Sequence, residues 1–152
     1  MTSDDDIRHM RAAIAASRAA SARGDMPFGA VLVKDGRALL TALNNQNSAP
    51  DCTGHAEIVL VRDAQRALGD AALRGSTVYA SGEPCAMCAG AMFWAGVTRV
   101  VYAASSPTID AALGGMSLGA RCADVLANAR PAVLVEGPFL EEEAAQALTA
   151  AP

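Results

Sequence analysis

Short apolar segments typical of strands alternate with helix-forming segments along this chain, and this alternation constrains the fold more than any other feature. The strand-like segments are residues 28–33, 38–43, 77–80, 99–103 and 132–136. Helices are predicted over residues 3–23, 55–68, 85–95, 117–127 and 141–150. Strands separated by helices favour a layered α/β domain with right-handed crossovers. We find no repeat or linker and predict one domain over residues 1–152.

Residues with defined conformational roles stand at the ends of several predicted elements. Ser3 or Asp4 can cap the first helix through its side-chain oxygen. The pair Asp35-Gly36 lies between the first two strand-like segments and favours a tight hairpin. Gly69 and Gly96 follow the second and third helical segments, where glycine commonly ends a helix.

The helical segments over 55–68 and 85–95 are both rich in apolar residues. The segment over 85–95 is apolar nearly all round, so we expect its helix to be covered on most sides. We expect the two helices to pack side by side on one face of the sheet.

Residues with metal-binding side chains stand where these two helices begin. His55 opens one of them, and Cys85 and Cys88 follow Pro84 at the start of the other. An imidazole and two thiolates suit a tetrahedral zinc ion. Two cysteines three positions apart share one face of a helical turn, and the positive end of the helix dipole favours thiolates. The sequence therefore predicts zinc held by His55, Cys85 and Cys88.

Glu57 supplies a carboxylate beside this predicted metal site. It lies two positions after His55, so both side chains can serve one site only if the metal sits beyond the end of the helix. Three protein ligands leave one position of a tetrahedral zinc ion for water, whose pKa falls to about 7. A carboxylate that is not a ligand can take the proton of that water, pass it to a ring nitrogen and protonate departing ammonia. The pattern indicates hydrolytic deamination.

The motifs at residues 55–57 and 84–88 resemble those of the zinc-dependent cytidine and nucleobase deaminase superfamily. The resemblance extends to residues 26–31, to Asn44 and to residues 90–95. It implies a three-layer α/β/α fold, called the cytidine-deaminase-like fold, with a five-stranded mixed sheet. It also implies a homodimer.

The resemblance implies a role for each site residue. His55, Cys85 and Cys88 would bind zinc, and Glu57 would shuttle protons. The Asn44 side chain would form a hydrogen bond to the substrate ring, and the Ala56 backbone N–H would contact a substrate carbonyl. Phe28 and Trp94 would be aromatic walls of the pocket.

Charge and hydropathy limit the expected partners. The formal net charge is −4, only one residue is lysine, and three consecutive glutamates occupy positions 141–143. This acidic segment would repel a phosphate backbone, so we expect no nucleic-acid partner. No apolar stretch approaches the ~20 residues that a membrane span needs, and the chain does not open on a signal sequence. We therefore expect a cytoplasmic protein with no membrane contact and a small heterocyclic base as substrate.

The segment Phe93-Trp94-Ala95 is similar to bacterial guanine deaminases, which favours a free base as substrate. Those enzymes resemble one another in carrying acidic residues after the fourth strand, whereas residues 114–119 of this chain contain none. Smaller rings such as cytosine or an amino-triazine therefore stay open. We predict a zinc-dependent deaminase of a free nucleobase or related amino-heterocycle, with a tRNA-editing adenosine deaminase as the alternative.

A non-catalytic alternative depends on Cys52, three positions before His55. Cys52, together with the three predicted ligands, would form a closed site in a zinc-stabilised interaction domain, which would have no use for Glu57. We otherwise interpret Cys52 and Cys122 as small core residues. His9 is expected to be exposed and without a role, and Glu83 is interpreted as a loop residue.

Overall fold

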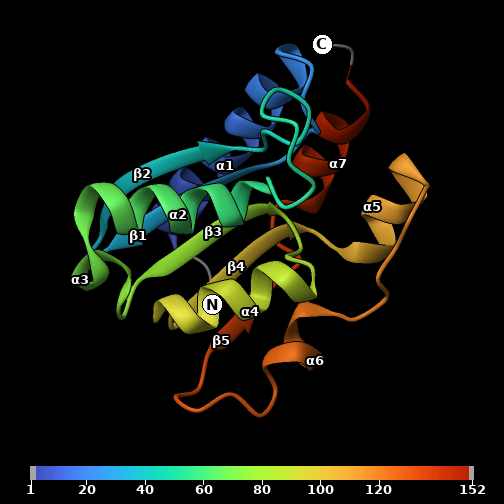
Figure 1. Ribbon diagram of the computed structural model, residues 1–152. Helices are drawn as coiled ribbons and strands as arrows, with labels where there is room; N and C mark the ends of the chain where they lie inside the picture. Colours follow the sequence, from blue (N-terminus) through green and yellow to red (C-terminus); the bar gives the residue numbers. More distant parts are fainter. Residues whose placement is uncertain (1–2, 151–152) are drawn as a thin grey trace.

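The computed structural model describes residues 3–150, and all of its strands form one five-stranded sheet (Figure 1). The strand order is β2-β1-β3-β4-β5. The five strands are β1 (Gly29–Lys34), β2 (Arg37–Leu43), β3 (Thr77–Gly82), β4 (Arg99–Ala104) and β5 (Leu134–Glu136). β1 pairs antiparallel with β2 and with β3, whereas β3, β4 and β5 run parallel. The prediction of a mixed five-stranded sheet is confirmed.

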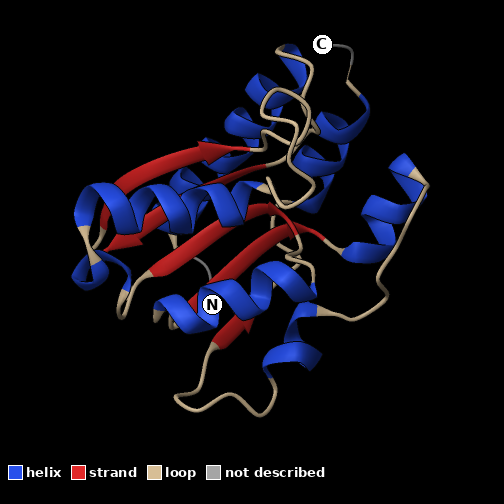
Figure 2. Ribbon diagram, in the orientation of Figure 1, coloured by secondary structure: helices blue, strands red, loops and turns tan. Residues whose placement is uncertain are grey.

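Helices cover both faces of this sheet (Figure 2). α1 (Asp4–Ala22) and α7 (Glu141–Thr149) lie on one face, and α2 (Ala56–Leu68) and α4 (Ala86–Ala95) lie side by side on the other. The short helix α3 (Asp70–Leu73) follows α2 directly. The three-layer α/β/α architecture is therefore confirmed, as is the expected pairing of the two apolar helices.

Alternate residues of β1 serve the two faces. Ala30 and Leu32 belong to the core under α2 and α4, and Val31 and Val33 belong to the core under α1 and α7. This division follows from the two-residue period of a strand. Gly29 allows α1 to approach closely, because a Cβ atom there would lie 2.5 Å from the carbonyl oxygen of Ala13.

The segment between β4 and β5 differs from the predicted one. The sequence predicts one helix over 117–127, whereas the structure has α5 (Ser106–Leu113) and the short α6 (Cys122–Leu126). The hydroxyl oxygen of Ser105 accepts a hydrogen bond from the Thr108 N–H, and Pro107 stands in the first turn, so α5 carried a start signal. Gly119, with φ +82°, interrupts the longer helix that the sequence suggested.

α4 is less covered than predicted. Its inner face is buried through Cys88, Ala89 and Met92, but Trp94 is 85% exposed. α2 and α6 pack against α4, and the exposure of Trp94 shows that part of its outer side is uncovered. Among the described residues, no helix combines the length and the apolar character that crossing a membrane requires.

The expectation for His9 is wrong. Its side chain is 5% exposed, and its ring centroid lies 5.2 Å from that of Tyr79. His9 lies on the side of α1 that packs against β3. The face of α1 that contacts the sheet is therefore wider than Met10 and Ile14 alone indicate.

Asp6 lies in a buried ionic cluster next to His9. Its carboxylate accepts hydrogen bonds from both terminal nitrogens of Arg99, at 2.9 and 3.2 Å, and from the Tyr79 hydroxyl. Burial opposes ionisation, but the hydrogen bonds from Arg99, Tyr79 and Ser3 outweigh it and hold the pKa of Asp6 well below its usual value.

We expect Asp6→Asn to lower the free energy of unfolding at pH 7 by about 2 kcal/mol, because hydrogen bonds to a charged group are lost. A depressed folded-state pKa stabilises the fold above the unfolded value, near 4, and this contribution disappears as the pH falls through the folded value. The difference between variant and wild type should therefore shrink below pH 4. Urea unfolding at pH 7 and pH 3 measures it. Asp5→Asn is the control, since the Asp5–Arg8 pair is exposed and should contribute less than about 1 kcal/mol.

Candidate metal centre and active site

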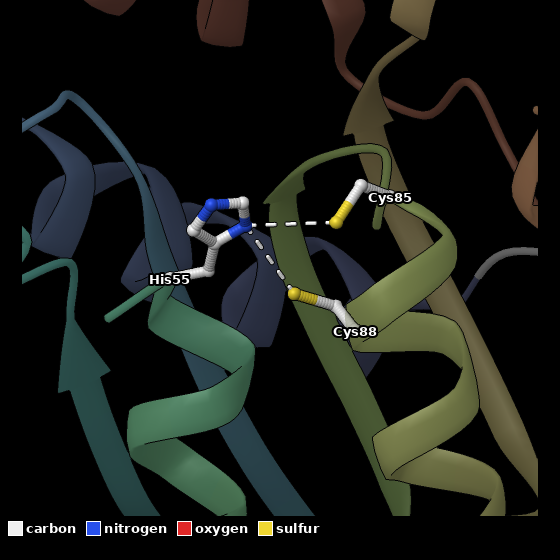
Figure 3. Close-up of side chains that lie close together, drawn as sticks. All are labelled: His55, Cys85 and Cys88. Carbon is white, nitrogen blue, oxygen red and sulfur yellow. Dashed lines mark hydrogen bonds between the residues drawn. The ribbon is translucent and has the colours of Figure 1, made fainter. Parts of the chain in front are cut away.

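The N-terminal ends of α2 and α4 meet at the centre of the site (Figure 3). His55 is the cap residue of α2 and has extended backbone angles, φ −66° and ψ 150°. Cys85 is the cap residue of α4, with φ −70° and ψ 175°. Because neither cap residue is helical, both side chains project beyond the helix ends, where Cys88 also reaches. The spacing of His55 and Glu57 requires this geometry.

The three predicted ligands converge on one point. The His55 Nδ1 atom lies 3.6 Å from the Cys85 Sγ atom and 3.5 Å from the Cys88 Sγ atom. On a tetrahedral zinc ion, sulfur at about 2.3 Å and nitrogen at about 2.0 Å are roughly 3.5 Å apart. The spacing of the donor atoms therefore fits zinc, and His55, Cys85 and Cys88 form a candidate zinc site.

The two sulfurs differ in their affinity for a proton. The hydrogen bond with Cys88 lowers the pKa of Cys85 to about 4, against the opposing effect of burial. The same hydrogen bond and burial raise the pKa of Cys88. This arrangement favours a thiolate at Cys85, and a metal cation would take the place of the proton on Cys88.

Glu57 is buried beside the three ligands. Its side chain is 5% exposed, and burial raises the pKa of its carboxyl group to about 7. It lines a small cavity of about 90 Å³ together with Phe28, Gln46, His55 and Gly82. A carboxyl group with a pKa near 7 can both accept and donate a proton in neutral solution.

A larger cavity of about 650 Å³ adjoins the small one and shares Phe28, Gln46 and His55 with it. Most of its outer wall comes from α5 and the glycine-rich loop that follows. The wall residues are Ile109, Asp110, Leu113, Gly114, Gly115, Met116, Ser117 and Leu118. The candidate metal ligand His55 therefore borders both cavities, and the Glu57 carboxyl group borders the smaller one.

Glu83 connects this wall to the segment that precedes Cys85. It is 7% exposed and stands two positions before Cys85. Its carboxylate accepts hydrogen bonds from the Ser106 N–H at 2.8 Å, from Arg121 Nε at 2.9 Å and from the Cys122 N–H at 3.0 Å. These donors stand at both ends of the wall segment. Describing Glu83 as only a loop residue is therefore incomplete.

We expect Glu83→Gln to loosen the wall segment, because the amide loses the charge that Arg121 pairs with and one acceptor oxygen. Hydrogen–deuterium exchange of the backbone over 106–121 should speed up, with zinc content unchanged. Glu142→Gln, an exposed position, is the matched control and should exchange as wild type. Unchanged exchange in the Glu83 variant would contradict this role.

The substrate contacts implied by the resemblance lie in different places. Phe28 lines both cavities and packs against Gly82, where an added Cβ atom would lie 2.7 Å from the ring. Ala56 is fully buried, and its N–H belongs to the first turn of α2, where no intrahelical acceptor exists. Asn44 is 1% exposed and lines neither cavity. Trp94 also lines neither and is exposed on α4, so within one chain it is not a pocket wall.

The other two cysteines stand apart from the metal cluster. Cys52 is exposed, which corrects its interpretation as a core residue, whereas Cys122 is buried as expected. Within residues 3–150, the group of potential metal ligands comprises His55, Cys85 and Cys88 without Cys52. The structure therefore gives no support to the closed four-ligand site.

Sequence reasoning did not identify Gln46 or the wall residues of α5 as part of the site. The Ser105–Pro107 start signal could have located α5, but nothing local in the sequence places its residues over the metal centre. Gln46 lies in an irregular loop whose path depends on tertiary contacts, including the hydrogen bonds from the Asn47 and Ser48 N–H groups to the Asp25 carboxylate.

Comparison with known proteins agrees with this geometry. Residues 3–104 match the family model for the cytidine and deoxycytidylate deaminase zinc-binding region, a range that contains all three candidate ligands. A tRNA-specific adenosine deaminase of Agrobacterium fabrum is 40% identical over 107 residues, which make up 70% of this chain and 70% of that protein. A probable cytosine deaminase of Schizosaccharomyces pombe is 32% identical over 148 residues, or 93% of this chain and 89% of that protein.

A solved structure of a guanine deaminase from Nitrosomonas europaea is also similar. It has a TM-score of 0.80 at 25% identity, and the similarity covers 97% of this chain and 84% of that one. The similarity therefore includes the described elements beyond residue 104, among them α5 and α7.

Proposed function

Because the chain belongs to the cytidine and deoxycytidylate deaminase zinc-binding family, we propose that it hydrolyses the amino group of a free nucleobase or a related amino-heterocycle. The observation that carries this proposal is the buried Glu57 carboxyl group, which shares a small cavity with the ligand His55 beneath a pocket of about 650 Å³. A closed structural zinc site would need neither the carboxyl group nor the pocket.

The residues of this chain divide the chemistry among them. His55, Cys85 and Cys88 would hold zinc, which when bound makes water nucleophilic near neutral pH. Glu57 takes a proton from the attacking water and delivers it to a ring nitrogen. It then moves the second proton to the departing amino group, so that the C–N bond breaks, a carbonyl forms and ammonia leaves.

Charge around the cavity supports a free base over a tRNA loop. The names of the similar proteins point to tRNA, cytosine and guanine, so similarity alone favours none of them. Asp110 lines the cavity, and Glu141 accepts a hydrogen bond from the Ser105 N–H where α5 begins. Three arginines at the end of α1, within α2 and at the start of α6 pair with carboxylates, as in Arg23–Asp25, Arg62–Asp51 and Arg121–Glu83. A phosphate backbone at this mouth would meet negative charge.

Ammonia release by the zinc-loaded protein tests the proposal. The panel contains guanine, cytosine, melamine, adenine and the corresponding nucleosides, together with an anticodon stem-loop RNA that carries adenosine at the wobble position. We expect turnover of at least one free base and no inosine in the RNA. Turnover of the RNA alone would establish the tRNA-editing alternative, and silence across the panel would contradict the proposed activity.

We also propose a homodimer, which would cover apolar side chains that the single chain leaves in water. Trp94 is 85% exposed, and Val125 is exposed on α6, which packs against α4; Leu134 is also exposed, on β5. Light scattering should give the mass of two chains, and Trp94→Asp should shift the equilibrium toward one chain. A monomeric wild-type protein at 100 µM, roughly a hundred times a micromolar dissociation constant, would contradict this expectation.

A further inference from the structure

The start of α2 lacks the side-chain cap that commonly stabilises the N-terminal end of a helix. His55 occupies the cap position, but its side chain makes no capping hydrogen bond. Its Nδ1 atom lies instead 3.5 and 3.6 Å from the two cysteine sulfurs of the candidate zinc site. A serine, threonine or aspartate at this position would satisfy one of the free N–H groups of the first turn. Because the imidazole serves the metal site, other residues have to fix the backbone at this end of α2.

Three side chains connect α2 to the turn that precedes it. The Asp51 carboxylate accepts hydrogen bonds from the Thr53 N–H at 2.9 Å and from the Thr53 hydroxyl group at 2.7 Å. Arg62, which lies within α2, donates from Nη2 to the Thr53 hydroxyl oxygen at 3.1 Å and from Nη1 to Asp51 Oδ2 at 3.4 Å. Asp51, Thr53 and Arg62 therefore form a clasp between the turn and the helix.

Backbone hydrogen bonds connect this clasp to His55. The His55 N–H donates to the carbonyl oxygen of Thr53 at 2.8 Å, and the Gly54 N–H donates to the carbonyl oxygen of Asp51 at 2.9 Å. Gly54 is buried, and a Cβ atom there would collide with the Asn45 side chain, so the backbone passes through a space that admits no side chain. The residue that carries the imidazole is thus fixed by the turn on one side and by α2 on the other.

We propose that the clasp directs the His55 imidazole toward the two cysteines and so holds one of the three zinc ligands in place before the metal binds. Asp51, Thr53 and Arg62 are then positioning residues, since they lie outside the group of ligand atoms and outside the linings of both cavities. A ligand that is already in place loses less conformational freedom on binding, which strengthens the interaction with the metal. The proposal rests on the proposed function, because it concerns the metal centre of that reaction, but zinc binding is measured separately from turnover.

Thr53→Val tests the clasp by replacing the hydroxyl group with a methyl group. The valine can neither donate to Asp51 nor accept from Arg62 through its side chain. We expect the zinc affinity, measured by competition with a chelator, to fall about 10- to 100-fold, the range typical of changes behind metal ligands. In the metal-free protein, hydrogen–deuterium exchange of the backbone over 53–57 should speed up, because the turn is less firmly attached to α2.

Matched variants separate the clasp from a general loss of stability. Thr53→Ser keeps the hydroxyl group and should keep the zinc affinity of wild type. Thr41→Val makes the same chemical change at an exposed position of β2 and should also bind zinc as wild type does. Arg62→Met opens the clasp from the helix and should lower the zinc affinity to a similar extent as Thr53→Val. The double variant should be no worse than the more affected single variant, because both changes disrupt one network.

Each outcome supports or overturns the proposal. If Thr53→Val or Arg62→Met binds zinc as tightly as wild type, the proposal is wrong. It is also wrong if Thr53→Ser binds zinc as weakly as Thr53→Val, since the hydroxyl group would then not be the cause. Should Thr53→Val fail to fold, Arg62→Met decides alone. If wild type binds zinc but deaminates none of the bases, the proposed function fails, whereas the zinc affinities of the variants still decide whether the clasp positions His55.

Discussion

Glu57→Gln is expected to abolish turnover while leaving the metal site intact. General acid–base catalysis by a positioned side chain contributes about 10²- to 10⁴-fold, and Glu57 would move two protons, so kcat should fall by at least that factor. The amide has the same shape, and Glu57 is outside the group of ligand atoms formed by His55, Cys85 and Cys88. Zinc content should therefore stay at one ion per chain, measured by mass spectrometry of the metal.

The matched control is Glu143→Gln. Glu143 forms an exposed ion pair with Arg11 at 2.9 Å and should tolerate the change with wild-type turnover. Full activity in the Glu57 variant would refute its role as the proton carrier. Loss of zinc from that variant would instead make Glu57 part of the metal site, which the geometry does not predict.

Cys88→Ser should weaken zinc binding and abolish the deaminase activity. The Cys88 side chain is fully buried, and its sulfur lies 3.5 Å from His55 Nδ1. A serine hydroxyl is a poor ligand for zinc, and even changes behind the ligands weaken metal binding about 10- to 100-fold. We expect zinc affinity to fall by more than about 100-fold and deamination to disappear with it. Titration with a competing chelator measures the affinity.

Cys52→Ser separates the catalytic site from a closed one. Cys52 is exposed and outside the ligand cluster, so this variant should keep wild-type zinc affinity and turnover. If it released zinc as readily as the Cys88 variant, Cys52 would be a fourth protein ligand. The non-catalytic alternative would then regain its basis.

The chemistry of the metal site was predictable because it lies in two short motifs. His55 and Glu57 stand at one helix start, and Cys85 and Cys88 at another, so local spacing already limits how they can meet. The five-stranded sheet was predictable for a similar reason, since strand and helix patterns repeat along the chain.

The rest of the pocket depends on contacts between distant segments. Gln46 reaches the cavity because hydrogen bonds shape its loop, and Asp110 does so because Glu83 holds both ends of the wall segment. Neither position has a local pattern that marks it. The family resemblance implied that Trp94 is a pocket wall, but the sequence does not reveal which side of α4 is covered.

X-ray absorption at the zinc edge tests the central claim most directly. For the zinc-loaded protein, we predict two sulfur ligands at about 2.3 Å, one imidazole nitrogen at about 2.0 Å and one further light atom that exchanges with solvent. Addition of a competing small anion should change that last shell and leave the sulfur count at two. A shell of three or four sulfurs, or a fourth position that solvent cannot reach, would contradict an open catalytic zinc site in this protein.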